Sequence, residues 1–205
     1  MASVVPHQSG ALSLPIPPPP VPRPRTLLVG AALAGTAGAM TIFTMVSIYL
    51  ARRSDVLNRG ETWLPRGSQI PLPQPNMMFL TLLMSCVTLA WAAWALRRED
   101  KQNAYIALAI TTLMAFAYVV QASYLFTLSE IPVNAPGGQG VLFWAISGGH
   151  LAMVLAGLVF FALMSFRALS GNFRRIPDGI TAVGIYWYIT VGVYAVIWYA
   201  VYITK

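Results

Sequence analysis

Charged residues are absent from five long apolar stretches of this 205-residue chain, and their absence limits what the chain can fold into. All 13 lysines and arginines and all six aspartates and glutamates of the chain lie outside these stretches. The apolar stretches cover residues 27–50, 78–96, 104–126, 141–166 and 180–203. Because an α-helix rises about 1.5 Å per residue, each stretch is long enough to cross a hydrocarbon layer of roughly 30 Å. The sequence therefore predicts five transmembrane helices.

Spanning β-strands are excluded, since they alternate apolar and polar residues, whereas residues 151–161 are apolar at every position. A composition of 57% hydrophobic and 9% charged residues also excludes a soluble domain of this size. We expect one all-α membrane domain over residues 27–205, preceded by an N-terminal arm over residues 1–26. No cleavable signal peptide is expected, because the first apolar stretch is too long for one.

The N-terminal arm contains a proline-rich segment at residues 15–24, for which polyproline II is the expected conformation, and we expect disorder over residues 1–14. Two interpretations stay open for the arm: an extension along a neighbouring subunit, or a flexible cytoplasmic tail. Cys86 is the single cysteine and lies within the second apolar stretch, so we expect a buried thiol and no intrachain disulfide.

Orientation is predicted from the basic residues that flank the stretches. One side of the membrane would carry Arg23, Arg25, Arg97, Arg98, Lys101, Arg167, Arg174 and Arg175, and the other Arg52, Arg53, Arg59, Arg66 and Lys205. The loop at 127–140 has Glu130 and no lysine or arginine, as is typical of an outer loop. The positive-inside rule then predicts the N-terminus inside and the C-terminus outside.

His150 is the only histidine within the apolar stretches, and the other histidine, His7, lies in the N-terminal arm. Bis-histidine haem ligation within the chain is thereby excluded, and Met153 lies on the same helix face as His150, so the two cannot be opposite axial ligands. We interpret His150 as a structural hydrogen-bonding residue in preference to a ligand, with Gln121 as a second polar residue inside the membrane. No catalytic, cofactor-binding or metal-binding residue is predicted.

The net charge of +7 is spread over both faces, without a basic stripe interleaved with aromatic residues, so we expect lipid headgroups and not nucleic acid as counter-ions. Small residues at four-residue spacing predict close helix packing. Two series have this spacing: Gly30, Ala34 and Gly38, and Gly148, Ala152 and Ala156. The aromatic residues of the last stretch are interpreted as an interfacial belt with helix packing; the alternative is a quinone or haem platform.

From residue 41 onwards the order of features resembles subunit III of the haem-copper (cytochrome c) oxidases, in its short five-helix bacterial form. The matching segments are residues 47–53, Trp63-Leu-Pro65 with Pro71-Leu-Pro73, residues 81–88, residues 91–98, residues 116–122 with their Gln-Ala pair, Gly148-Gly-His150, and Tyr186-Trp187. Four positions depart from the family pattern. Gly38 and Tyr124 occupy positions where a glutamate is common, and Met153 and Tyr188 replace later histidines.

The resemblance implies a non-catalytic subunit of an aerobic terminal oxidase in the bacterial cell membrane. Its partners would be subunit I, which holds the haems and copper, subunit II, which receives electrons, and further respiratory subunits. Bound phospholipid is implied as well, with Arg52, Trp91 and Arg97 as candidate lipid contacts or, alternatively, simple interfacial anchors. The four departures argue against a part in proton delivery. The alternatives are an accessory subunit of a related complex such as nitric oxide reductase or, less favoured, a small transporter.

Overall fold

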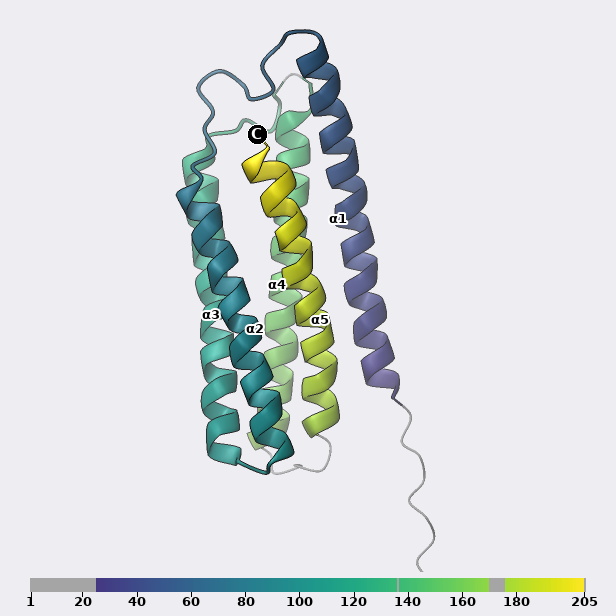
Figure 1. Cartoon of the computed structure of the whole chain (residues 1–205), viewed down its shortest axis with the longest axis vertical. Coiled ribbons are helices and arrows are strands. Elements are labelled where there is room, and N and C mark those ends of the chain that lie inside the picture. The colour runs from purple at the N-terminus through teal and green to yellow at the C-terminus, as the bar shows by residue number, and fades with distance from the viewer. Residues whose placement is uncertain (1–24, 136, 170–175, 205) are drawn as a thin grey trace, which may run out of the picture.

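The computed structural model describes residues 25–135, 137–169 and 176–204, and within these the regular secondary structure is helical. Residues 1–24 of the predicted N-terminal arm, with His7 and the proline-rich segment at 15–24, lie outside the described residues. The helices run antiparallel to their chain neighbours (Figure 1). Their bounds are α1 Thr26–Asn58, α2 Pro73–Arg97, α3 Lys101–Ser129, α4 Gln139–Leu169 and α5 Ile176–Ile197, which continues into the π-helix η2 Trp198–Ile203. Within the described residues, five helices are long and apolar enough to cross a membrane, which confirms the predicted all-α, five-helix fold. The orientation of the termini stays a prediction.

Helix α5 lies at the centre of the bundle, between α1 on one side and the α2–α3 pair on the other (Figure 1). It contacts α1, α2 and α4, and 61% of its span is buried inside the bundle, against 22% for α1. The outward faces are apolar: Leu33, Leu113 and Phe166 are each about two-thirds exposed, at 66%, 68% and 69%. Such a surface is stable only when lipid or another apolar protein surface covers it.

Charged residues extend α1 beyond its apolar stretch. The stretch ends at Leu50, but the helix continues through Arg52 and Arg53 to Asn58. Helix α2 also begins earlier than its apolar stretch, at Pro73, because proline fits the first turn of a helix, where no backbone N–H bond is required. The connection expected at residues 51–77 is therefore the shorter segment 59–72.

Two tryptophans attach the α1–α2 and α3–α4 loops to the bundle. Trp63, in the α1–α2 loop, is buried and donates its indole N–H to the Tyr49 hydroxyl of α1 at 2.8 Å. The two rings meet edge to face, with centroids 5.1 Å apart. Trp144 of α4 donates to the Ile131 carbonyl of the α3–α4 loop at 3.0 Å. Aromatic packing and a tryptophan N–H bond thus help to hold each loop, and Ser68 and Gln69 of the α1–α2 loop also bond to the carbonyls of Glu130 and Ser129.

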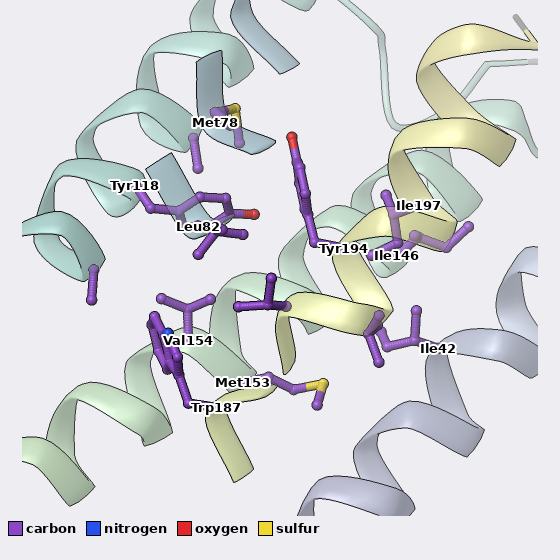
Figure 2. Packing of buried hydrophobic residues seen from close by; sticks show 14 of the residues in the cluster. Ile42, Met78, Leu82, Tyr118, Ile146, Met153, Val154, Trp187, Tyr194 and Ile197 are labelled. Atoms are coloured by element: carbon purple, nitrogen blue, oxygen red, sulfur yellow. The ribbon is translucent and has the colours of Figure 1, made fainter. Parts of the chain in front are cut away.

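The apolar core draws on all five helices, including Ile42 of α1 and Tyr118 of α3 (Figure 2). Trp187 of α5 is completely buried, and its ring meets that of Phe161 of α4 edge to face, with centroids 5.1 Å apart. Its indole N–H donates to the Ser85 hydroxyl of α2 at 2.9 Å. A buried N–H without a partner would be costly, so this bond lets the core hold its largest side chain.

Candidate functional site

His150 lies at the centre of the polar interior and links three helices. It is 1% exposed on α4, and its Nε2 lies 3.0 Å from the Thr190 carbonyl oxygen of α5. A carbonyl oxygen only accepts, so Nε2 carries the proton of the neutral ring. Nδ1 is then an acceptor, and the Tyr118 hydroxyl of α3 donates to it at 2.8 Å. The two bonds fix both the tautomer and the orientation of the imidazole.

Tyr194 of α5 completes what we call the tyrosine–histidine cluster, formed by Tyr118, His150, Thr190 and Tyr194. Its ring packs edge to face on Tyr118, with centroids 5.4 Å apart, and its centroid lies 5.2 Å from that of His150. The phenols of Tyr118 and Tyr194 are labelled in Figure 2, on facing helices. The Tyr194 hydroxyl donates to the Pro75 carbonyl of α2 at 3.2 Å, so the cluster joins α2, α3, α4 and α5.

A haem or metal site does not fit this cluster. Both nitrogens of His150 have hydrogen-bond partners, and the Nδ1 lone pair is occupied by the Tyr118 hydroxyl. Within residues 25–135, 137–169 and 176–204, no group of three or more His, Cys, Asp and Glu side chains is arranged to hold a metal ion. Met153 points toward α1 and contacts Gly38. The arrangement suits hydrogen bonding and proton sharing, not ligation.

Gln121 of α3 is half-buried and forms the second polar link predicted inside the membrane. Its amide nitrogen lies 3.2 Å from the Thr81 hydroxyl of α2, and its amide oxygen 3.3 Å from the same hydroxyl. Seven residues after Thr81 on α2, the hydroxyl of Thr88 lies 2.8 Å from that of Thr111 on α3. These contacts join α2 to α3 by paired hydroxyl and amide groups.

The candidate lipid contacts lie at two different ends of the bundle. Arg52 is exposed near the end of α1, whereas Arg97 is exposed at the last residue of α2, and α1 and α2 run in opposite directions. Trp91 is 37% exposed on α2, nearer to Arg97. The structure thus brings Trp91 and Arg97 to the same end and leaves Arg52 apart from them. Whether these residues touch lipid stays a prediction.

A cation–π pair beside Trp91 and Arg97 was not predicted. The Arg98 guanidinium lies over the Trp94 ring at 4.2 Å from its centroid. Both residues are exposed, and their four-residue spacing on α2 is the signal that indicates such a pair. This contact holds a positive charge next to an aromatic ring at the end of α2, as in an interfacial anchor.

The four departures from the family pattern fall into two groups. Tyr124 and Tyr188 are 54% and 44% exposed on the bundle surface. Gly38 and Met153, in contrast, face each other: a Cβ atom at Gly38 would lie 2.9 Å from the Met153 methyl carbon. The two positions where a glutamate and a histidine are common in the family therefore form one apolar contact between α1 and α4.

Most members of the two predicted small-residue series face the outside of the bundle, with Gly38, which faces Met153, as the exception. Close packing of these outward residues against a partner helix stays a prediction. Gly30, Ala34, Ala152 and Ala156 are exposed, and nothing lies within 4 Å of a Cβ placed at Gly30 or Gly148. Other glycines make the close approaches inside the bundle. These pairs are Gly35 with Ile189, Gly149 with Ile42, Gly157 with Trp187 and Gly179 with Met164.

The aromatic residues of the last helix serve mainly in packing. Trp187, Tyr194 and Tyr202 are almost fully buried, and the Tyr202 hydroxyl lies 3.3 Å from that of Ser147. Tyr199 is 62% exposed, as a membrane-facing aromatic residue should be. The helix packing expected for these aromatic residues is thus confirmed for Trp187, Tyr194 and Tyr202, whereas the interfacial belt at the C-terminal end of the helix stays a prediction.

These features define a class of protein: an all-α, multi-span membrane protein with an apolar outer surface. The polar side chains of its interior cluster are hydrogen-bonded to one another or to backbone carbonyls. A family model described as "Cytochrome c oxidase subunit III" matches residues 28–205. The chain therefore belongs to the cytochrome c oxidase subunit III family.

Similar proteins carry the same description. The chain is 30% identical to "Cytochrome c oxidase subunit 3" of Prototheca wickerhamii over 70% of its length and 55% of that protein. It is 30% identical to the Bos taurus protein of the same name, over 71% of its length and 55% of that protein. A Rickettsia conorii protein, "Probable cytochrome c oxidase subunit 3", is 28% identical over 53% of this chain and 38% of its own length. This bacterial relative agrees with a plasma membrane location, and the chain spans about half the length of these relatives.

Proposed function

We propose that this chain is the non-catalytic subunit III of an aerobic respiratory terminal oxidase. The observation that carries the proposal is the family match over residues 28–205. The chemistry of the interior agrees with it, since the polar side chains of the cluster are bonded to one another and none is directed at a substrate. Electron transfer and oxygen reduction would then take place on haem and copper held by subunits I and II.

The outer surface of α1 is the part of the bundle best suited to packing against subunit I. Ala34 is exposed, and Gly30 has no atom within 4 Å of its Cβ position, so another helix can approach α1 closely there. Most of α1 faces away from the bundle, because only 22% of its span is buried. Phospholipid would cover the remaining apolar surface, with Arg52 at one end and Trp91 and Arg97 at the other.

A small transporter is not favoured by the described residues. Transport of a polar solute requires a polar path across the membrane. Here the buried histidine, tyrosines and threonines bond to one another or to backbone carbonyls. An accessory subunit of nitric oxide reductase has no specific observation in its favour.

The proposal is tested by purifying the tagged chain from its native membranes in mild detergent, with mass spectrometry of the partners and a reduced-minus-oxidised spectrum. We expect a large haem-copper subunit, a cytochrome spectrum and oxygen consumption that is sensitive to cyanide. Recovery of nitric oxide reductase subunits would replace this proposal with the alternative. Recovery of the chain alone, without colour, would overturn both.

The packing surface is tested by Ala34→Phe, which places a large ring on the outward face of α1 without entering the bundle. Ala90→Phe is the matched control, because Ala90 is exposed on α2. We expect Ala34→Phe to reduce the amount of catalytic subunit that co-purifies, and Ala90→Phe to leave it unchanged. Equal recovery with both variants would show that the partner lies elsewhere.

A further inference from the structure

Tyr118 differs from the other buried tyrosines in the partner of its hydroxyl. Its O–H donates to the unprotonated Nδ1 of His150, which is a base. The hydroxyls of Tyr186 and Tyr194 donate to backbone carbonyls, which do not take up a proton at ordinary pH. Tyr202 pairs with the Ser147 hydroxyl, and Tyr49 accepts from Trp63. Among the buried tyrosines of the described segments, Tyr118 alone has a hydroxyl that is hydrogen-bonded to a basic group able to take up its proton.

Removing an electron from a phenol makes its O–H strongly acidic, so oxidation is favourable only where the proton has a place to go. At Tyr118 the proton would move 2.8 Å, heavy atom to heavy atom, to Nδ1 of His150. The resulting imidazolium would keep its Nε2–H bond to the Thr190 carbonyl. The pair therefore has the geometry for moving one electron and one proton together without a change in fold.

Aromatic rings connect this pair to the outer edge of the bundle. Tyr194 lies between Tyr118, at 5.4 Å between centroids, and Phe79, at 6.0 Å. Phe79 is stacked on Trp198 at 5.2 Å and an interplanar angle of 21°. Trp198 is half-buried, and its indole N–H donates to Asn76 at 2.7 Å. An uninterrupted series of ring contacts thus leads from the half-buried Trp198 of η2 to the buried phenol of Tyr118.

We propose that Tyr118 and His150 form a redox-active, proton-coupled site that is oxidised through Trp198, Phe79 and Tyr194. The oxidant is a peroxyl radical of a membrane lipid, which meets the bundle surface at Trp198. The site would trap the oxidising equivalent inside this chain and end the radical reaction in the lipid. This inference concerns the chain alone and does not depend on the proposed oxidase partners.

The reaction balances in electrons and protons. The lipid peroxyl radical takes one electron from Trp198 and a proton from interfacial water, and so becomes a hydroperoxide and leaves hydroxide in the water. The electron deficiency moves inward to Tyr118, with Phe79 and Tyr194 as contacts that are not themselves oxidised. The Tyr118 O–H bond breaks, its proton binds Nδ1 of His150, and a neutral tyrosyl radical remains beside the imidazolium.

The site is tested on the purified full chain with photogenerated tris(bipyridine)ruthenium(III) as the oxidant, followed by rapid freezing and electron paramagnetic resonance. We expect a tyrosyl radical that is lost in Tyr118→Phe and retained in Tyr186→Phe. Tyr186 is the matched control, because it is equally buried but bonded to the Met153 carbonyl and outside the ring series. Helicity by circular dichroism verifies that both variants are folded.

Two further measurements separate a redox role from a structural one. At high field, the gx value of the radical should be shifted downwards, as expected for a tyrosyl oxygen beside a positively charged hydrogen-bond donor. Phe79→Leu should slow the appearance of the Tyr118 radical and prolong a tryptophan radical at Trp198. An unchanged radical in Tyr118→Phe, the gx value of an unbonded tyrosyl, or no radical although the ruthenium is oxidised would each overturn the proposal.

Discussion

At the scale of single residues, the glycines of α4 differ in the free space around them. Substitution by alanine should therefore change the stability of the protein differently at each glycine. A Cβ at Gly157 would lie 2.8 Å from two ring carbons of Trp187, which is completely buried and cannot move aside. Nothing lies within 4 Å of a Cβ at Gly148, so only the backbone of the unfolded chain is affected there.

We expect Gly157→Ala to lower the free energy of unfolding by about 1–3 kcal/mol, because the added methyl overpacks the Trp187 site. Gly148→Ala should be neutral or stabilising by up to roughly 1 kcal/mol, since alanine favours the helix over glycine. The measurement is unfolding in detergent by circular dichroism for both variants. Equal stabilities would mean that the ring of Trp187 has room to move.

Which glycines make close contacts was beyond prediction from the sequence. The spacing of Gly30, Ala34 and Gly38 does identify a strip of small residues, but not the direction in which the strip faces. These helices are apolar all round, because lipid covers the outside and side chains fill the inside. A hydrophobic pattern without a polar face does not indicate how a helix is rotated, so the inward glycines at 35, 149 and 157 carry no distinguishing signal.

At the scale of the elements, a buried hydrogen bond between side chains attaches the α1–α2 loop to α1. Tyr49→Phe removes the acceptor for the Trp63 indole N–H, which is then buried without a partner. We expect a loss of about 1–3 kcal/mol in the free energy of unfolding. Trypsin should also cleave faster after Arg59 and Arg66, both of which lie in this loop. Tyr199→Phe, on the exposed face of η2, is the control and should change neither quantity.

Helix α3 begins with a titratable cap at Asp100. Its carboxylate accepts from the backbone N–H of Asn103 at 3.1 Å and from the Asn103 side-chain amide at 2.6 Å. These hydrogen bonds, the side-chain bond most strongly, lower the pKa of the Asp100 carboxyl below its usual range. A lowered folded-state pKa means that the cap stabilises the helix above the carboxyl's ordinary pKa and is lost as the pH falls through the lowered one.

We therefore expect the Asn103 amide resonance to titrate with a midpoint below the ordinary aspartate value of about 3.9. Asp100→Asn, which keeps an N-cap acceptor without a titrating group, should remove this titration while leaving α3 helical. A midpoint at or above the ordinary value would contradict the capping geometry. The measurement is a pH series of nitrogen–proton correlation spectra in detergent.

Hydropathy predicted the existence and order of the five helices but not their ends. An apolar stretch marks the hydrocarbon layer, whereas a helix continues as far as its backbone bonds and caps allow. Helix α1 accordingly continues through Arg52, which is exposed, to Asn58. The site was predicted in part, because His150 and Gln121 are polar residues in apolar stretches. Tyr118 and Thr190 were missed as partners, since pairing between separate helices depends on their rotation.

For the whole molecule, the positive-inside rule makes a testable statement about orientation. In a Cys86→Ala background, we expect a cysteine at Glu61 to react with a membrane-impermeant maleimide in intact cells. A cysteine at Glu99, exposed in the α2–α3 turn, should react only after the membrane is made permeable. The opposite labelling pattern would show that the N-terminus faces outwards.

The central position of α5 has a consequence for synthesis in the cell. Of the described helices, α1 leaves the ribosome first and α5 last, yet α5 is a main neighbour of α1. At ordinary rates of translation, α1 would wait in the membrane on the order of ten seconds before this neighbour is available. During that interval the inward face of α1, with Gly35 and Ile42, is open to other proteins. Insertion factors that occupy this face until α5 arrives would decide whether the bundle closes correctly.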